Sequence, residues 1–253
     1  MKIGIIGVGQ IGATLIRQYS KAGHDIKMAN AGSLEKLKEL AEETGAKAVT
    51  LTEAVMDIDV LIVSIPLIEI PKLSKSLGQN ISAKTIVIDT CNYYPIRDGR
   101  IDEIENGMPE SVWVSNQLQQ PVVKVYNNII AGSLVQSGLP KGSATRIALP
   151  ISGDDQQSKS LVADLVNDSG FDALDIGNLQ ESWRQQPGSP IYCTDLNLPQ
   201  LKENITKAKG ELLAERRELA LQFILKQNPE QWMDWWKDCI INNRNIYESD
   251  LSV

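Results

Sequence analysis

The chain has 253 residues and a formal net charge of −7, with hydrophobic and charged fractions of 42% and 23% that are ordinary for a globular protein. This length is enough for one large domain or for a principal domain with an appendage. Because nucleic acids and anionic membranes attract basic surfaces, the negative charge argues against both as the main partner.

Three scattered cysteines, Cys91, Cys193 and Cys239, are too few for a disulfide framework or a metal cluster and indicate reduced thiols. Met1 leads directly into an apolar run without the layout of a signal peptide. No apolar run approaches the roughly 20 residues of a membrane span. We therefore expect a soluble, cytoplasmic protein with no metal site.

Apolar segments alternate with helical patterns from the start of the chain. Residues 2–7 are rich in isoleucine and almost wholly apolar, as in a parallel strand covered on both faces. Residues 10–23 follow with helical spacing and end in Gly23, a favoured residue just after a helix. Further strands are predicted at 24–30, 46–50, 59–66 and 84–92, and helices at 34–45, 52–58 and 68–77. Because the helical connections between parallel strands are right-handed crossovers, the alternation of strands and helices predicts an α/β fold with a doubly wound parallel sheet.

The turn between the first strand and the first helix contains a complete GxGxxG motif, formed by Gly7, Val8, Gly9, Gln10, Ile11 and Gly12. The first glycine permits the tight turn, the second lets the backbone approach a pyrophosphate, and the third lets the helix pack on the strand. The phosphates would then lie at the positive end of the helix. In this strand–turn–helix context the motif predicts a dinucleotide site.

The end of the second predicted strand lacks the acidic residue that usually binds the ribose of NAD, and Asn30 stands there instead. A carboxylate would repel the 2′-phosphate of NADP, so its absence favours NADP over NAD. Asn30 and Ser33 can donate hydrogen bonds, and Lys36 lies one helical turn beyond. Ser33 can also cap the following helix. No arginine completes this pocket.

Later segments carry a more particular pattern. The stretches DTCNYYPIRDG, QPVVKVYNNI and ALPISGDDQQSKSLVADLVNDSGFDALDIGNL, together with GVGQIG and VSIP, resemble the dinucleotide-binding oxidoreductases related to NADPH:coenzyme F-420 oxidoreductase. The resemblance covers residues 1 to about 195. It implies a Rossmann domain that transfers hydride between NADP and a flavin or deazaflavin such as coenzyme F-420. The electron acceptor itself stays open.

The resemblance also implies site residues. Ser64, Ile65 and Pro66 match the loop that passes close to the nicotinamide, and Asn127 begins the segment that lines its other side. Asn92 follows the fifth strand, at the sheet edge where ligands of doubly wound folds bind. Hydride transfer to a flavin-like ring depends mainly on positioning, so we expect no catalytic side chain. The single histidine, His24, is expected to be structural.

The second half continues with predicted strands at 121–126, 145–153 and 171–177 and a helix between the last two, expected to extend one sheet. Residues 198–227 and 231–241 have helical patterns, followed by a polar tail. We therefore expect an NAD(P)-binding domain at 1–195 and a helical extension at 196–253. This extension packs on the sheet or on another subunit; alternatively Trp232, Trp235 or Trp236 covers the acceptor site of a partner in a homodimer.

Two other functions fit the glycine motif. One is a relative of the β-hydroxyacid dehydrogenases, imine reductases or pyrroline-carboxylate reductases, whose second halves are all helical. Lys124 and Asn128 have the spacing of a catalytic lysine and asparagine on a helix, but VVKVYN is typical of a strand, where residues four apart are not helical neighbours. The other is a non-enzymatic, NADP-binding redox sensor. The favoured prediction is an NADP-dependent oxidoreductase acting on a small-molecule electron acceptor.

Overall fold

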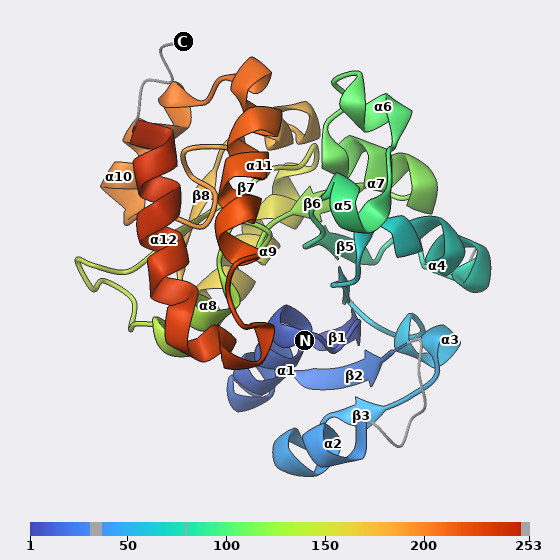
Figure 1. Cartoon of the computed structure of the whole chain (residues 1–253). Coiled ribbons are helices and arrows are strands. Elements are labelled where there is room, and N and C mark those ends of the chain that lie inside the picture. The colour runs from blue at the N-terminus through green and yellow to red at the C-terminus, as the bar shows by residue number, and fades with distance from the viewer. Residues whose placement is uncertain (31–36, 79, 249–253) are drawn as a thin grey trace.

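The computed structural model describes residues 1–30, 37–78 and 80–248 (Figure 1). Its larger sheet contains six parallel strands in the order β3-β2-β1-β4-β5-β6, as the sequence predicts for a doubly wound fold. The strands are β1 (Lys2–Ile6), β2 (Asp25–Ala29), β3 (Lys47–Ala48), β4 (Val60–Val63), β5 (Ile86–Asp89) and β6 (Val122–Lys124). The connecting helices are α1 (Gln10–Lys21), α2 (Lys38–Thr44), α3 (Leu51–Ala54), α4 (Ile70–Leu77), α5 (Pro95–Asp98), α6 (Asp102–Glu105) and α7 (Glu110–Leu118).

Both faces of this sheet are covered, which explains its continuous apolar strands. All four residues of β4 are buried. Val60 and Ile62 belong to the core cluster that also contains α1, whereas Leu61 and Val63 belong to the cluster that contains α4 and α7. Successive side chains of a strand point to opposite faces, so a strand between two helical layers buries its side chains on both faces, which favours an apolar run.

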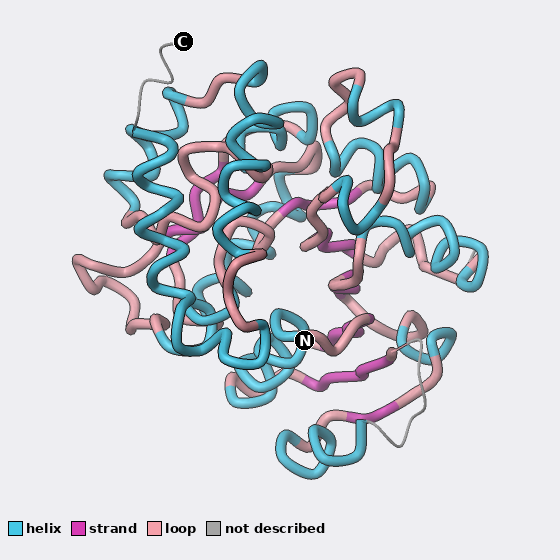
Figure 2. The backbone as a smooth tube through the Cα atoms, viewed as in Figure 1, coloured by secondary structure: helices cyan, strands magenta, loops and turns pink. Residues whose placement is uncertain are grey.

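The predicted second-half strands form a smaller sheet. β7 (Ala148–Ile151) and β8 (Asp172–Asp175) pair in parallel, and α9 (Gln156–Asp168) connects them. Among the described residues, strand pairing between this sheet and the larger one is limited to an antiparallel bridge between Lys124 and Ser152, with backbone hydrogen bonds of 2.8 and 3.2 Å. The expected extension of one sheet is therefore limited to this bridge. Figure 2 shows the connection before β7, residues 137–147, as a protruding loop after α8 (Ala131–Gln136).

The C-terminal residues form α10 (Leu198–Asn204), α11 (Leu213–Ile224) and α12 (Trp232–Glu248). The two longer helices, α11 and α12, lie side by side, and α12 also packs on α8 (Figure 1). The helix predicted to end at residue 241 continues to Glu248, so much of the expected polar tail is helical. No helix in the described part of the chain has the length and apolarity needed to span a membrane.

Candidate functional site

The glycine turn between β1 and α1 has the geometry expected for a dinucleotide. Gly7 has a φ of +98°, and a Cβ atom there would lie 2.1 Å from the carbonyl oxygen of Ser64. A Cβ atom on Gly12 would lie 2.0 Å from the carbonyl oxygen of Gly7, so helix and turn are in direct contact. Gly9 differs, because a Cβ atom there would meet nothing within 4 Å. The first and third glycines therefore permit packing, and the second leaves open space.

This open space lies at the start of α1. Gly9 is the residue that precedes the helix, and no side chain caps the first amides. The first turn also contains no acidic residue. The positive end of the helix dipole and its unpaired N–H groups therefore face the space left by Gly9, an arrangement that suits an anionic pyrophosphate. The residues present fit the diphosphate of a nicotinamide dinucleotide.

Two neighbouring segments flank the glycine turn. The Gly7 amide donates to the Ala29 carbonyl at 2.9 Å, which places the end of β2 and the exposed Asn30 beside the turn. The Ser64 amide donates to the Ile6 carbonyl at 2.8 Å. Val8 and Ile65 pack partly on the core, and Pro66 is exposed. Ser33 and Lys36, the other predicted contacts of the NADP ribose, lie outside the described residues.

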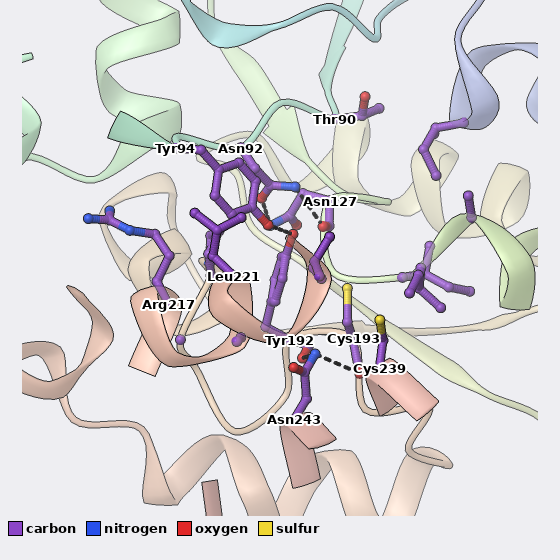
Figure 3. Close-up of a pocket in the computed structure, with 18 of the residues that line it drawn as sticks. Thr90, Asn92, Tyr94, Asn127, Tyr192, Cys193, Arg217, Leu221, Cys239 and Asn243 are labelled. Atoms are coloured by element: carbon purple, nitrogen blue, oxygen red, sulfur yellow. Dashed lines mark hydrogen bonds between the residues drawn. The ribbon is translucent and has the colours of Figure 1, made fainter. Parts of the chain in front are cut away.

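A cavity of about 330 Å³ begins at the first turn of α1 (Figure 3). Gln10 and Ile11 line it together with Asn92 and Asn127, four of the residues predicted from sequence. The opposite wall comes from the loop after η3 (Leu179–Gln185) and from α11 and α12. Val8, Asn30 and the segment 64–66 are not part of its lining as described. The C-terminal helices therefore close this cavity within the same chain.

The two predicted asparagines, Asn92 and Asn127, are hydrogen-bonded to each other just beyond the carboxyl ends of β5 and β6. The Asn92 side chain donates to the Asn127 carbonyl at 2.9 Å, and the Asn127 side chain donates to Asn92 Oδ1 at 3.0 Å. Gln185 joins them, donating to Asn127 Oδ1 at 2.8 Å while its own Oε1 accepts from the Ser152 hydroxyl at 2.8 Å. Most of these groups are buried. The network fixes the cavity wall and ties the two sheets together.

Two tyrosines of the cavity lining meet at their hydroxyl groups. The hydroxyl groups of Tyr94 and Tyr192 are 2.6 Å apart, as Figure 3 shows. Burial raises the pKa of both hydroxyls well above the usual value, so both stay protonated at physiological pH. Arg97 stacks on the Tyr94 ring and donates to the Asn92 carbonyl at 2.6 Å. The tyrosines were not predicted from sequence, although Tyr94 lies two residues after Asn92.

The remaining reactive groups of the cavity are not poised for acid, base or nucleophilic chemistry. Cys193 and Cys239 both line it. Burial raises the pKa of the Cys239 thiol to about 11 and that of Cys193 further, so neither is a thiolate at neutral pH. Arg97 is paired with Asp98 at 2.8 Å, and Arg217 with Glu218 at 3.2 Å. No cluster of metal-ligating side chains occurs in residues 1–30, 37–78 and 80–248.

Lys124, the lysine considered for a hydroxyacid dehydrogenase, does not line the cavity as described. Its side chain is fully buried, and Nζ is 3.1 Å from the Asp89 carboxylate. It also donates to the Cys91 carbonyl. Asp89 accepts a further hydrogen bond of 2.7 Å from the Ser111 hydroxyl. These contacts make Lys124 a structural cation that joins β5 and β6.

Two sequence comparisons relate this chain to known proteins. The sequence model of the family described as NADP oxidoreductase, coenzyme F420-dependent, matches residues 2–93, which include the glycine turn, Ser64, Pro66 and Asn92. The chain is also 38% identical over 110 residues to the Escherichia coli (strain K12) protein YjhV, an alignment that covers 43% of this chain and 77% of YjhV.

Solved structures share the fold. The structure of SMa0349, a hypothetical protein from Sinorhizobium meliloti, superimposes with a TM-score of 0.68 and 27% sequence identity. The match covers 78% of this chain and 95% of the SMa0349 chain. A structure from Arthrobacter sp. FB24, titled as a candidate F420-dependent NADP-reductase, is 19% identical with a TM-score of 0.60 and covers 71% of this chain and 86% of its own. From the family match, together with a relative that is 38% identical and covered over 77% of its length, the chain belongs to the coenzyme F420-dependent NADP oxidoreductase family of NAD(P)-dependent enzymes.

Proposed function

We propose that the protein transfers hydride between NADP(H) and a flavin- or deazaflavin-type acceptor of the coenzyme F-420 kind. The observation that carries this proposal is the cavity that starts at Gln10 and Ile11, directly beside the glycine turn. Its described lining has aromatic, aliphatic and amide groups, two arginines paired with carboxylates, and no carboxylate of its own. Such a lining suits flat, nearly neutral rings rather than a substrate that needs proton transfer from a side chain.

In this proposal the residues of the chain bind, orient and exclude water. Gly7, Gly9 and Gly12 would hold the diphosphate, and the segment 64–66 and Asn127 would flank the nicotinamide. When bound, the nicotinamide would supply the chemistry of hydride exchange with the acceptor ring. The hydroxyl pair of Tyr94 and Tyr192 would hydrogen-bond polar edges of the ring. Because donor and acceptor carbons must be in near-attack contact, positioning by this wall supplies the rate enhancement.

The proposed cofactor preference is NADP over NAD, because Asn30 stands where a carboxylate would repel the 2′-phosphate. We expect isothermal titration calorimetry to give tighter binding of NADPH than of NADH. Asn30→Asp should reduce or reverse that difference, whereas Asn80→Asp, a change of the same kind at an exposed position, should leave it unchanged. Stronger binding of NADH by the unaltered protein would contradict the proposal.

The acceptor is tested by anaerobic oxidation of NADPH with coenzyme F-420, FMN, FAD, a quinone and a ferric complex. We expect acceleration with the deazaflavin or a flavin and little with the ferric complex. Tight NADPH binding without turnover of any acceptor would favour the redox-sensor alternative. Tyr94→Phe or Tyr192→Phe should raise the KM for the acceptor more than the Kd for NADPH, because these hydroxyls are proposed to contact the acceptor ring and not the diphosphate.

The division at residues 195 and 196 and the homodimer are also proposals. Residues of α11 and α12 line the cavity, so we propose that the helical extension completes the site of its own chain. Leu225, Met233 and Ile241 expose large apolar side chains on this extension, which supports a homodimer formed through it. Light scattering coupled to size exclusion tests this state, and Ile241→Lys should shift a dimer toward monomer.

A further inference from the structure

A second cavity, of about 610 Å³, lies within the C-terminal extension. It is bordered by α10, α11 and α12, the orange and red helices of Figure 1, and by the segment 190–196. It shares no described lining residue with the cavity beside the glycine turn. The family match at residues 2–93 and the proposed hydride transfer involve none of its residues.

The charge of this cavity is opposite to that of the protein. Its described lining contains the four cations Lys207, Lys209, Arg216 and Arg244 and no carboxylate, in a chain with a net charge of −7. Arg244 is held in place by donating to the backbone carbonyls of Thr194 at 2.6 and 2.8 Å and of Asp195 at 3.1 Å. Lys207 pairs with Glu203 at 2.9 Å, but both side chains are more than half exposed, so this pair is weak.

Arg216 is the central feature of the cavity. It lies on α11 and is only 6% exposed, yet its Nε and Nη1 atoms are buried without a hydrogen-bond partner among the described residues. The buried Tyr247 hydroxyl, on α12, has the Gly188 amide near its oxygen, but its own proton has no acceptor in the described part of the chain. Leaving buried polar groups and charges unpaired is costly, and native proteins rarely do so. Both residues line the cavity, so an anion bound there would place its negative charge next to them.

We propose that this cavity binds a small multivalent anion through its phosphate or carboxylate groups. Arg216 brings a buried positive charge with unpaired N–H groups to this cavity, and guanidinium groups are favoured partners of phosphate and carboxylate oxygens. The Tyr247 hydroxyl donates to the same anion. Lys209 and Arg244 add charge at the rim. The proposal stands whether or not the acceptor of the oxidoreductase is a flavin.

The test is thermal unfolding of the full chain with sodium phosphate, sodium citrate or sodium chloride at equal ionic strength, each with and without NADP⁺. We expect phosphate or citrate at about 100 times its Kd to raise Tm by about 5–10 °C above the chloride value. The rise should persist with NADP⁺ bound, because the two cavities are separate. Stronger binding of phosphate than of citrate would identify a phosphate ligand, and the reverse would identify a polycarboxylate.

Substitutions test which residues cause the anion-dependent rise in Tm. Arg216→Met should abolish the anion-dependent rise and should not lower Tm in chloride, because it removes an unpaired buried charge. If Arg216 only stabilised the fold, Arg216→Met would lower Tm in chloride instead. Lys209→Ala should weaken binding of phosphate or citrate at least threefold. This variant tests the proposal if Arg216→Met does not fold. Lys226→Ala, at an exposed position outside the lining, is the control. An equal response in chloride, or full retention in Lys209→Ala and Arg216→Met, would overturn the proposal.

Discussion

The indole ring of Trp236 lies directly against Gly132, so that a Cβ atom on this glycine would come within 2.3 Å of the ring. Gly132 is in α8, just after the nucleotide half of the sheet, and Trp236 is in α12. Trp236 is therefore buried in its own chain, which differs from the idea that it covers the site of a partner. This contact holds α12, with Cys239 and Asn243, at the wall of the cavity.

Gly132→Ala should displace α12 from α8. Such overpacking lowers the free energy of unfolding by about 1–3 kcal/mol, and we expect the KM for the acceptor to rise because α12 lines the cavity. Urea unfolding and steady-state kinetics measure the two effects. Gly210→Ala is the matched control, because its added Cβ would only touch Trp183 at 3.9 Å. Equal stability of the two variants would contradict the role given to the Trp236 contact.

The three glycines of the nucleotide turn should respond differently to alanine. Gly12→Ala places a Cβ atom 2.0 Å from the Gly7 carbonyl oxygen, so we expect a large loss of stability. Gly9→Ala meets nothing within 4 Å and should leave Tm nearly unchanged. It should nevertheless weaken NADPH binding about tenfold or more, because the methyl group occupies the space next to the phosphates. Calorimetry and thermal unfolding test both, and unchanged NADPH affinity of Gly9→Ala would show that the nucleotide lies elsewhere.

The sequence predicted the larger sheet well because its signals are local. Each strand is a short apolar run, and the three glycines act on neighbours within the same turn. The pairing of β7 with β8, apart from the larger sheet, was not predicted. Strands 121–126 and 145–153 are both apolar, and composition does not reveal whether they pair along their length or through one bridge. Register between distant strands depends on tertiary packing, which one sequence does not show.

The site was predicted in part for the same reason. Asn92 and Asn127 follow strands of the larger sheet, and their place at its carboxyl edge follows from topology. Tyr192 and Gln185 come from a loop far along the chain, and Tyr94 meets Tyr192 across 98 positions. No periodicity connects such residues. The pair of tyrosines directly after Asn92 was the one local signal available for this wall.

Lys124→Met tests whether Lys124 is structural or catalytic. Removing Lys124 leaves the Asp89 carboxylate buried without its cation, so we expect the free energy of unfolding to fall by about 3–5 kcal/mol. Asp89→Asn in the same chain should recover part of this loss. Turnover per folded molecule should be largely retained, because Lys124 does not line the cavity. Lys72→Met, at an exposed position, is the control. Loss of turnover with unchanged stability would instead support the hydroxyacid dehydrogenase alternative.

Glu110, the first residue of α7, should make stability depend on pH. Its side chain is 1% exposed, and burial raises the pKa of its carboxyl from 4.5 to about 7, although the positive charge of Lys124 offsets part of this shift. Between these two values the folded chain keeps a proton that the unfolded chain releases. Glu110 therefore lowers stability progressively as pH rises from 4.5 to 7, by about 3 kcal/mol in total, and adds no further loss above that range.

Glu110→Gln should remove this loss, so urea unfolding should show a stability gain that is small near pH 4.5 and largest above pH 7. The exposed Glu42→Gln should give a curve parallel to that of the unaltered protein. A Glu110→Gln curve that is also parallel would mean that the buried carboxyl keeps its ordinary pKa.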